Sequence, residues 1–368
     1  MKIICEKTKL AEALSGVQRA VAQKSTIAAL EGVLLTTQGT NLCLCGYNTE
    51  MGITTSIPAN ITESGSIVLG ARLFTEIIRK LPDDTIELDV EPNLFATITA
   101  GKSKFELVGI DSAEFPTLPS VENESSFKLN SNIFKSMIRQ TIFSVSETDI
   151  KPVHTGTLFE LKNKSLTLVS VDGYRLALRK EPIKEEMELI FVVPGKTLKE
   201  VLRLMPENSE EDIAIYAGMR HVVFEIGEYT VISRLLEGEF IDYTATIPEK
   251  KDIQVIVGVQ DFADAIDRVS LLISDRLKTP IKCLFSKNNI HASCTTSIGK
   301  ADDDVVCKNL SDKNLEIAFN NKYMSDVLKN VESDEVVITL NTALSPIKIT
   351  PKDDDACVFV ILPVRIKS

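Results

Sequence analysis

The 368-residue sequence has no tryptophan, only three histidines and only 6% aromatic residues. The histidines, His154, His221 and His291, lie in unrelated segments, and none is at metal-ligand spacing from another histidine or a cysteine. Proteins that bind single-stranded nucleic acid stack the bases on aromatic side chains. The low aromatic content therefore argues against single-strand binding, and the histidines predict no metal site.

The cysteines show no functional spacing either. Their number is odd, they are scattered, and no C-x-x-C pair occurs. Cys43 and Cys45 would lie on one face of a strand, where packing is the expected role. We expect all seven to be reduced thiols: Cys5, Cys43, Cys45, Cys283, Cys294, Cys307 and Cys357.

Motifs for catalysis are also missing. The sequence has neither a glycine-rich phosphate loop nor a G-x-S-x-G nucleophile elbow. The acidic runs Asp302–Asp304 and Asp353–Asp355 lie in turn-like surroundings and are expected to be solvated loops. We predict a non-enzymatic binding or architectural protein without cofactor or metal. An enzyme that uses the aspartate runs with a metal ion is the remote alternative.

No apolar run approaches the length of a membrane span, and the N-terminus has no signal-peptide pattern. We expect a cytoplasmic protein without a membrane partner. The net charge is −11 and the isoelectric point about 5.0, which taken alone argues against nucleic acid as a partner.

What the sequence does contain is internal repetition. Apolar residues at i, i+3, i+4 and i+7 form one face of a helix, and two series of such sets recur at offsets of 124 to 128 residues. Two independent series at one period indicate a triplicated domain. The predicted helices are residues 9–21, 71–81, 132–145, 196–205, 260–273 and 322–331.

Between the helices lie segments with the period-2 alternation of half-buried strands, broken by Asn and Gly turns. Each unit is therefore predicted to be an α+β domain of two helices on antiparallel sheet. Pro-containing segments close the first two repeats. The predicted domains are residues 1–122, 123–247 and 248–368.

Only the middle repeat contains an Asp-Gly pair between two extended runs, within Leu166–Lys180. This pair predicts a tight β-hairpin, because glycine tolerates positive φ.

Positive charge is concentrated on the predicted helices. They carry thirteen basic and seven acidic residues, a net charge of +6 in a chain of net charge −11. These side chains could simply form solvated helix faces. If the helices of all repeats shared one surface, that surface would suit the phosphate backbone of duplex DNA without reading its sequence.

Three stretches, taken with the triplicated α+β pattern, resemble a known family over the whole chain. They are Val171–Ala177, the junction with Phe240, Asp242 and Tyr243, and the terminal Leu362–Arg365. The sequence resembles the bacterial DNA polymerase III β subunits, the sliding clamps. The resemblance implies a DNA-clamp fold whose head-to-tail homodimer forms a closed ring of six domains around duplex DNA.

The resemblance also implies residue roles. DNA contacts would come from Lys24, Arg72, Lys196 and Arg203. The heterologous dimer interface would join Phe105 and Leu107 on an edge strand to Leu271 and Leu272 at the end of a helix.

The family tethers the replicative polymerase and other proteins to DNA and so confers processivity. The implied partners are duplex DNA, the DNA polymerase III α subunit, the clamp loader, other polymerases and repair proteins. The proteins would bind through short linear peptides in a cleft between domains two and three. Its walls would be His154, Val171, Gly173, Tyr174, Arg175, Leu176, Ile241, Thr246, Val360, Ile361, Leu362, Pro363, Val364 and Arg365.

The chain departs from the family pattern at a few positions. Tyr174 stands where His is frequent, and His154 and Ile241 stand where Leu and Pro are familiar. The loop Glu147–Asp149 and the tail Ile366–Ser368 also differ from family members. A protein-binding scaffold of three repeats with no DNA role remains the main alternative, favoured if the four basic residues above were scattered over different faces.

Overall fold

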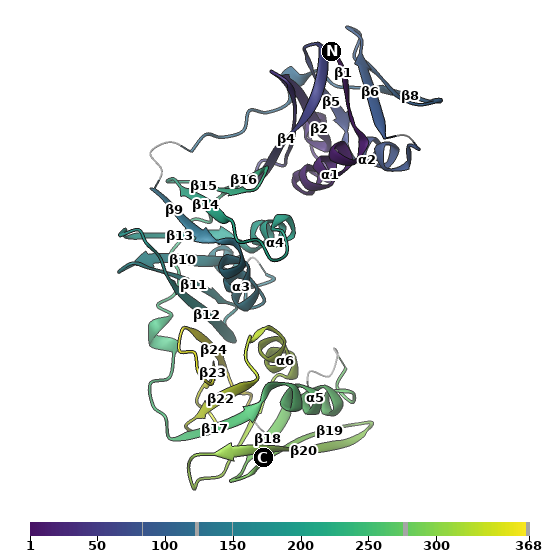
Figure 1. Cartoon of the computed structure of the whole chain (residues 1–368). Coiled ribbons are helices and arrows are strands. Elements are labelled where there is room, and N and C mark those ends of the chain that lie inside the picture. The colour runs from purple at the N-terminus through teal and green to yellow at the C-terminus, as the bar shows by residue number, and fades with distance from the viewer. Residues whose placement is uncertain (83, 122–124, 149, 275–278, 366–368) are drawn as a thin grey trace. The chain divides into compact units, whose positions relative to one another are not determined.

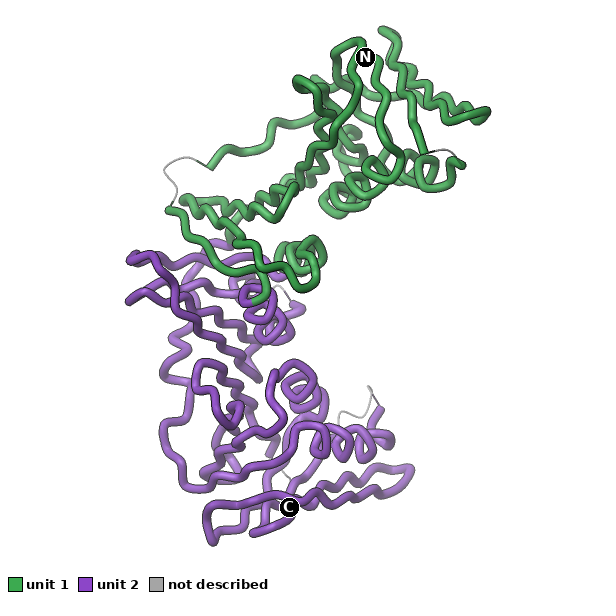
Figure 2. The backbone as a smooth tube through the Cα atoms, viewed as in Figure 1, with its two compact units in different colours: residues 1–132, 196–235 green, residues 133–195, 236–368 purple. Residues whose placement is uncertain are grey.

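The computed structural model of the chain describes residues 1–82, 84–121, 125–148, 150–274 and 279–365. The chain packs as two compact units, residues 1–132 with 196–235 and residues 133–195 with 236–368 (Figure 2). The three domain boundaries expected from the repeats stay a prediction. Asp149 and Ile366–Ser368, which the sequence singled out, lie outside the described residues.

The first unit is built on one antiparallel sheet. Among the described residues its main path runs β8-β7-β6-β1-β4-β16-β15-β14-β9, with β2, β3 and β5 joined beside β4. Its strands are β1 Lys2–Glu6, β2 Gly32–Gln38, β3 Asn41–Tyr47, β4 Met51–Glu63, β5 Ser66–Gly70, β6 Thr85–Val90, β7 Phe95–Ala100, β8 Ser103–Val108, β9 Ser125–Asn130, β14 Asp212–Ala217, β15 His221–Ile226 and β16 Tyr229–Arg234.

The helices of this unit are α1 Lys7–Val17, α2 Ala71–Lys80 and most of α4 Gly195–Leu204 (Figure 1). Helix α2 buries Phe74, Ile77 and Ile78 while its basic residues stay exposed, as the 3.6-residue period requires. A β-carbon on Gly16 would overlap the ring of Tyr229, so glycine lets α1 approach β16 closely. Short 3₁₀ turns connect the elements: η1 Gln18–Ala20, η2 Ala28–Glu31 and η3 Ser112–Glu114.

The second unit has its own antiparallel sheet, with the order β13-β10-β11-β12-β24-β23-β22-β17-β20-β19-β18-β21 among the described strands. The bounds are β10 Gly156–Lys162, β11 Ser165–Val171, β12 Arg175–Pro182, β13 Leu189–Pro194, β17 Ile253–Gly258, β18 Ile281–Phe285, β19 Asn289–Thr296, β20 Gly299–Asn309, β21 Leu315–Phe319, β22 Glu335–Leu340, β23 Ile347–Pro351 and β24 Cys357–Ile361.

Three helices belong wholly or mainly to this unit: α3 Ser131–Ile142, α5 Val259–Ser270 and α6 Asn321–Asn330. Helices α5 and α6 pack against each other (Figure 1). Their buried stripes join the strands in one core that includes Phe262, Phe285, Phe319 and Phe359. The 3₁₀ turns are η4 Pro152–Thr155 and η5 Thr244–Thr246.

All six predicted helices are present, which confirms the periodicity argument. The main differences are at their ends. Helix α5 ends at Ser270, so Leu271 and Leu272 follow the helix rather than belonging to it.

The predicted hairpin within Leu166–Lys180 is confirmed. Strands β11 and β12 pair in register from Ser165 with Pro182 to Val171 with Leu176. Gly173 at the turn has φ +90°, the conformation that favours glycine.

The expectation that Asp302–Asp304 form a loop is wrong, because these residues lie within β20. Asp303 accepts a hydrogen bond of 2.5 Å from Arg268, and Asp304 accepts one of 2.6 Å from Asn289. Hydrogen bonds from these partners offset the repulsion between adjacent carboxylates in the strand. Asp353–Asp355 do lie in the turn between β23 and β24, as expected.

All seven cysteines are free thiols, and burial raises the pKa of Cys45 to about 12. None of the helices in the described ranges is both long enough and apolar enough to span a bilayer.

Candidate functional site

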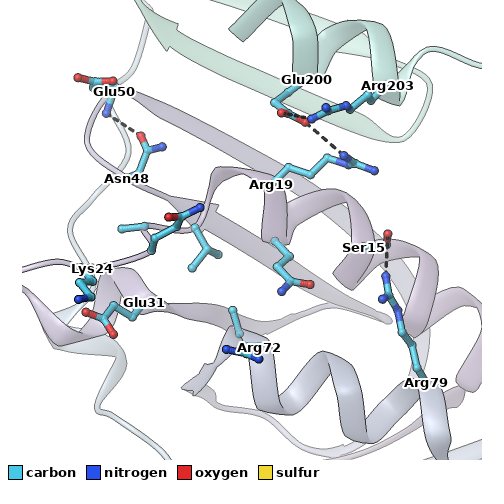
Figure 3. Close-up of a pocket in the computed structure, with 15 residues that line it drawn as sticks. Ser15, Arg19, Lys24, Glu31, Asn48, Glu50, Arg72, Arg79, Glu200 and Arg203 are labelled. Atoms are coloured by element: carbon cyan, nitrogen blue, oxygen red, sulfur yellow. Dashed lines mark hydrogen bonds and ion pairs between the residues drawn. The ribbon is translucent and has the colours of Figure 1, made fainter. Parts of the chain in front are cut away.

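A cavity of about 1260 Å³ in the first unit is lined by basic side chains (Figure 3). We call it the basic cavity. Its five basic residues outnumber its three acidic ones. They come from α2, α4 and the segment after α1: Arg19, Lys24, Arg72, Arg79 and Arg203, with Glu31, Glu50 and Glu200 as the acidic residues.

Two of the arginines share one carboxylate. Glu200 accepts a hydrogen bond of 3.3 Å from Nη1 of Arg19 and one of 2.5 Å from Nη1 of Arg203, and Figure 3 shows both arginines converging on it. One negative charge is therefore shared between two positive charges. Arg72 is 90% exposed, with its Nε 3.6 Å from Glu76. The cavity keeps an excess of positive charge that can meet an anionic ligand.

Three of the four residues expected to contact DNA line this cavity: Lys24, Arg72 and Arg203. Lys196 is exposed at the start of α4 but is not among the lining residues. Arg19 and Arg79 were not among the four. The helix charge count pointed to them, since both lie in predicted helices.

One of the thirteen basic residues on the predicted helices is not exposed in the structure. Lys135 of α3 is buried, whereas the other twelve helical basic residues are exposed. The exposed set can meet solvent or a ligand.

A smaller cavity of about 280 Å³ lies in the second unit. We call it the apolar cavity. The β11–β12 turn, the segment around η5 and strand β24 form its walls. It is lined by Val171, Gly173, Tyr174, Arg175, Leu176, Ile241, Ala245, Thr246, Pro346, Val360 and Leu362.

Nine of these eleven residues belong to the predicted peptide cleft, so the structure brings together segments that lie far apart in the sequence. Ala245 and Pro346 were missed. Nothing in their local sequence marks them, because a small residue and a proline are ordinary loop residues.

The turn that forms one wall is held by Asp172. Its Oδ1 accepts hydrogen bonds from the backbone N–H groups of Tyr174 at 2.9 Å and Arg175 at 3.0 Å. The aspartate side chain replaces backbone partners that a tight turn leaves unsatisfied. The ring of Tyr174 therefore stands on a fixed turn, and 62% of the residue is exposed.

The chain's last described residues fold back onto this wall. The N–H of Leu362 donates to the carbonyl of Tyr174, and the N–H of Val364 donates to that of Ala318, both at 2.8 Å. Leu362 lines the apolar cavity, whereas Pro363, Val364 and Arg365 lie beyond its lining.

Two other expected cleft residues also lie outside the apolar cavity. Ile361 is fully buried in the core of the second unit. His154 lines a neighbouring cavity of about 530 Å³, which shares Ile241 with the apolar cavity. Burial and the charge of Lys151 lower the pKa of His154, so its neutral form is favoured.

Two strand edges among the described residues carry, or lie beside, the residues of the expected dimer interface. Strand β8, with Phe105 and Leu107, ends its sheet and pairs only with β7 among the described strands. Residues 299–306 of β20 pair with β19, and β17 joins β20 only at 307–309. Exposed apolar side chains lie on or near both edges, including Val108 at 71%, Leu271 at 82% and Val306 at 81%. Leu272 is half-buried.

Among the described residues, no group of three or more His, Cys, Asp or Glu side chains could hold a metal ion.

Three family models match the chain in order. They describe the DNA polymerase III beta subunit: its N-terminal domain at residues 1–119, its central domain at 128–242 and its C-terminal domain at 244–365. The chain belongs to the DNA polymerase III beta subunit family.

Individual relatives match this chain along almost all of its length. The beta sliding clamp of Staphylococcus epidermidis is 34% identical over 362 residues, covering 96% of each chain. The solved DNA polymerase sliding clamp of Bacillus subtilis matches with a TM-score of 0.97 and 32% identity over 100% of both chains. A solved chain from Eubacterium rectale has a TM-score of 0.95 and 34% identity over 99% of both chains.

The family relationship covers both cavities. The beta-subunit models for the N-terminal and central domains include all residues of the basic cavity. The apolar cavity takes its lining from segments matched by the central and C-terminal beta-subunit models.

Proposed function

We propose that this chain is a sliding clamp, a ring of two copies that encircles duplex DNA and tethers the replicative polymerase and other DNA-processing proteins to it. The observation that carries the proposal is the match to beta sliding clamps over 96% of the chain. Such a ring confers processivity topologically, since a closed loop cannot leave DNA without opening.

Duplex DNA is held through its phosphates. The basic cavity supports this proposal, because three of the four proposed DNA-contacting residues line it together with Arg19 and Arg79. The fourth, Lys196, lies exposed at the start of α4. Contacts of this kind position the protein without reading the sequence of the bases.

The ring is closed by a head-to-tail interface between the edge of β8 in one copy and the edge of β20 in the other. Open strand edges readily accept a new strand. Apolar residues lie beside these edges and would be buried by the contact: exposed Phe105 and half-buried Leu107 on one side, exposed Leu271 and half-buried Leu272 on the other. Three domains per copy, at 1–122, 123–247 and 248–368, give six in the ring.

Partner proteins bind in the apolar cavity by a short extended peptide that carries Leu and Phe. The cavity has the size and the largely apolar lining for such side chains. The proposed partners are the DNA polymerase III α subunit, the clamp loader, other polymerases and repair proteins. Residues Pro363, Val364 and Arg365, His154 and buried Ile361 form the surroundings of the cavity in this proposal.

The clamp acts by binding alone, without catalysis, cofactor or metal, and works in the cytoplasm where bacterial chromosomes are copied. A scaffold without a DNA role is less well supported, because three of the four basic residues share one cavity.

Retention on circular DNA tests the proposal. The chain is loaded onto a nicked circular plasmid with a bacterial clamp loader and ATP, and the complex is separated by gel filtration. We expect the protein to stay with the circle and to be lost once a restriction enzyme linearises it. Equal loss from circle and linear DNA would contradict the proposal.

A further inference from the structure

Arg175 of the apolar cavity has its hydrogen-bonding partners already supplied by the protein. Its Nε donates to Asp172 Oδ2 at 2.9 Å, its Nη1 to Asp326 Oδ2 at 2.5 Å and its Nη2 to the carbonyl of Phe143 at 2.6 Å. Two carboxylates thus contact one guanidinium, so its positive charge is fully compensated. Such charge-assisted hydrogen bonds are among the stronger ones in proteins.

Aromatic rings cover the guanidinium as well. Its central carbon lies 4.6 Å from the ring centroid of Tyr323 and 5.5 Å from that of Phe143. The side chain is only 8% exposed. A carboxylate of an incoming peptide would have to displace existing partners to bind it, so direct recognition of a peptide is not what this geometry favours.

The partners of Arg175 come from three different elements. Asp172 belongs to the β11–β12 turn, Asp326 and Tyr323 to helix α6, and Phe143 follows the end of α3. The ring of Tyr174 also stacks on Tyr323, with centroids 6.3 Å apart. The cavity wall is thus fastened to one helix by an ion pair and by stacked rings.

We propose that Arg175 is a positioning residue that ties the wall of the apolar cavity to α6 and to the end of α3, so that peptide affinity depends on Asp326, which lies outside the cavity. The inference rests on the proposed peptide-binding role of the cavity. It adds that Arg175 acts through helix α6 rather than by touching the peptide.

The test uses the full chain and a fluorescein-labelled pentapeptide of sequence SLSLF, with affinity measured by fluorescence anisotropy. The variants are Asp326→Ala, Asp326→Asn, Arg175→Met and the double variant Arg175→Met with Asp326→Ala. The matched control is Asp334→Ala, which removes an exposed carboxylate just after α6. Thermal unfolding checks that every variant is folded.

We expect Asp326→Ala to weaken binding about tenfold, the scale of one missing hydrogen bond to a charged group. Asp326→Asn, which keeps an acceptor oxygen, should lie between Asp326→Ala and the wild type, and Asp334→Ala should bind as the wild type does. The double variant should bind within about twofold of Arg175→Met, because both changes break the same link between the cavity wall and α6.

Hydrogen exchange supplies a readout that a general loss of stability would not give. Peptide binding should slow amide exchange in α6 of the wild type but not of Asp326→Ala. If the wild type binds the peptide and Asp326→Ala binds it equally well, the positioning role of Arg175 is contradicted. The proposed function would be unaffected by that result. Absence of wild-type binding would overturn the cavity as a peptide site and the tie with it.

Discussion

The backbone N–H of Leu362 donates a hydrogen bond of 2.8 Å to the carbonyl oxygen of Tyr174. This bond continues the pairing of β24 with β12 by one step beyond Ile361, which pairs with Arg175. The end of the chain and the β11–β12 turn therefore form one continuous wall of the apolar cavity, although they are distant in sequence.

Removing the chain from Leu362 onward should abolish binding of a Leu- and Phe-containing peptide. The deletion takes away one side of the apolar cavity but leaves β24 and the proposed dimer edges in place. The milder change Leu362→Ser should weaken binding about tenfold, because it removes an apolar side chain that a bound peptide would cover. Fluorescence anisotropy measures both. Met219→Ser, at a residue 99% exposed, serves as the control, and full affinity in the truncated chain would contradict the assignment.

A charge at Leu272 should give monomers, because the proposed interface would then bury an unpaired charge. Leu271→Glu tests the same surface at a residue 82% exposed, where the fold itself tolerates the change. Sedimentation velocity over a range of concentrations reports the oligomeric state. Met219→Glu is the matched control, and dimers that persist in both leucine variants would rule out this surface.

Reversal of charge at Arg72 and Arg203 should weaken the equilibrium affinity of the chain for a short linear duplex and make that affinity less dependent on salt. Each phosphate that the variant no longer neutralises should reduce the slope of log affinity against log salt by about 0.9. The measurement is the affinity for a fluorescein-labelled linear duplex, taken by fluorescence anisotropy over a range of salt concentrations. Lys287→Glu reverses a charge on a residue of the second unit that lines neither cavity, and it should behave as the wild type. An identical slope in the Arg72 and Arg203 variant would count against the basic cavity.

His154 should make the fold less stable in mild acid. Burial lowers the pKa of His154 in the folded chain, so below the ordinary value of about 6.5 the unfolded chain binds more protons than the folded one. Stability therefore falls as the pH drops through that value toward the lowered pKa. The midpoint of thermal unfolding, measured at pH 7.5 and at pH 5.5, should fall less in His154→Leu than in the wild type. Since burial also lowers the pKa of His221, some acid sensitivity should remain in that variant. An equal fall in both chains would show that His154 does not cause the loss of stability in mild acid.

Much of the fold follows from the sequence because it depends on local patterns. Helix α2 is recognisable from Phe74, Ile77 and Ile78, which lie on one face at helical spacing. The β11–β12 turn is recognisable from Asp172-Gly173, whose chemistry suits positive φ.

Other features depend on residues that meet only in the folded chain. Asp303 is stable in a strand because Arg268 reaches it from α5, and no local pattern reports that. Two of the three hydrogen-bonding partners of Arg175, Phe143 and Asp326, lie 32 and 151 residues away, so its link to α6 could not be predicted from its neighbours. The site residues came from the family resemblance. The structure adds which of them share a cavity.

The central claim is that two copies of this chain close into a ring around DNA, and an electron microscopy image of the purified particle tests it most directly. The account predicts a closed ring of two chains with a central hole wide enough for a duplex. A particle without a hole, or a single chain at concentrations where the dimer should form, would contradict it.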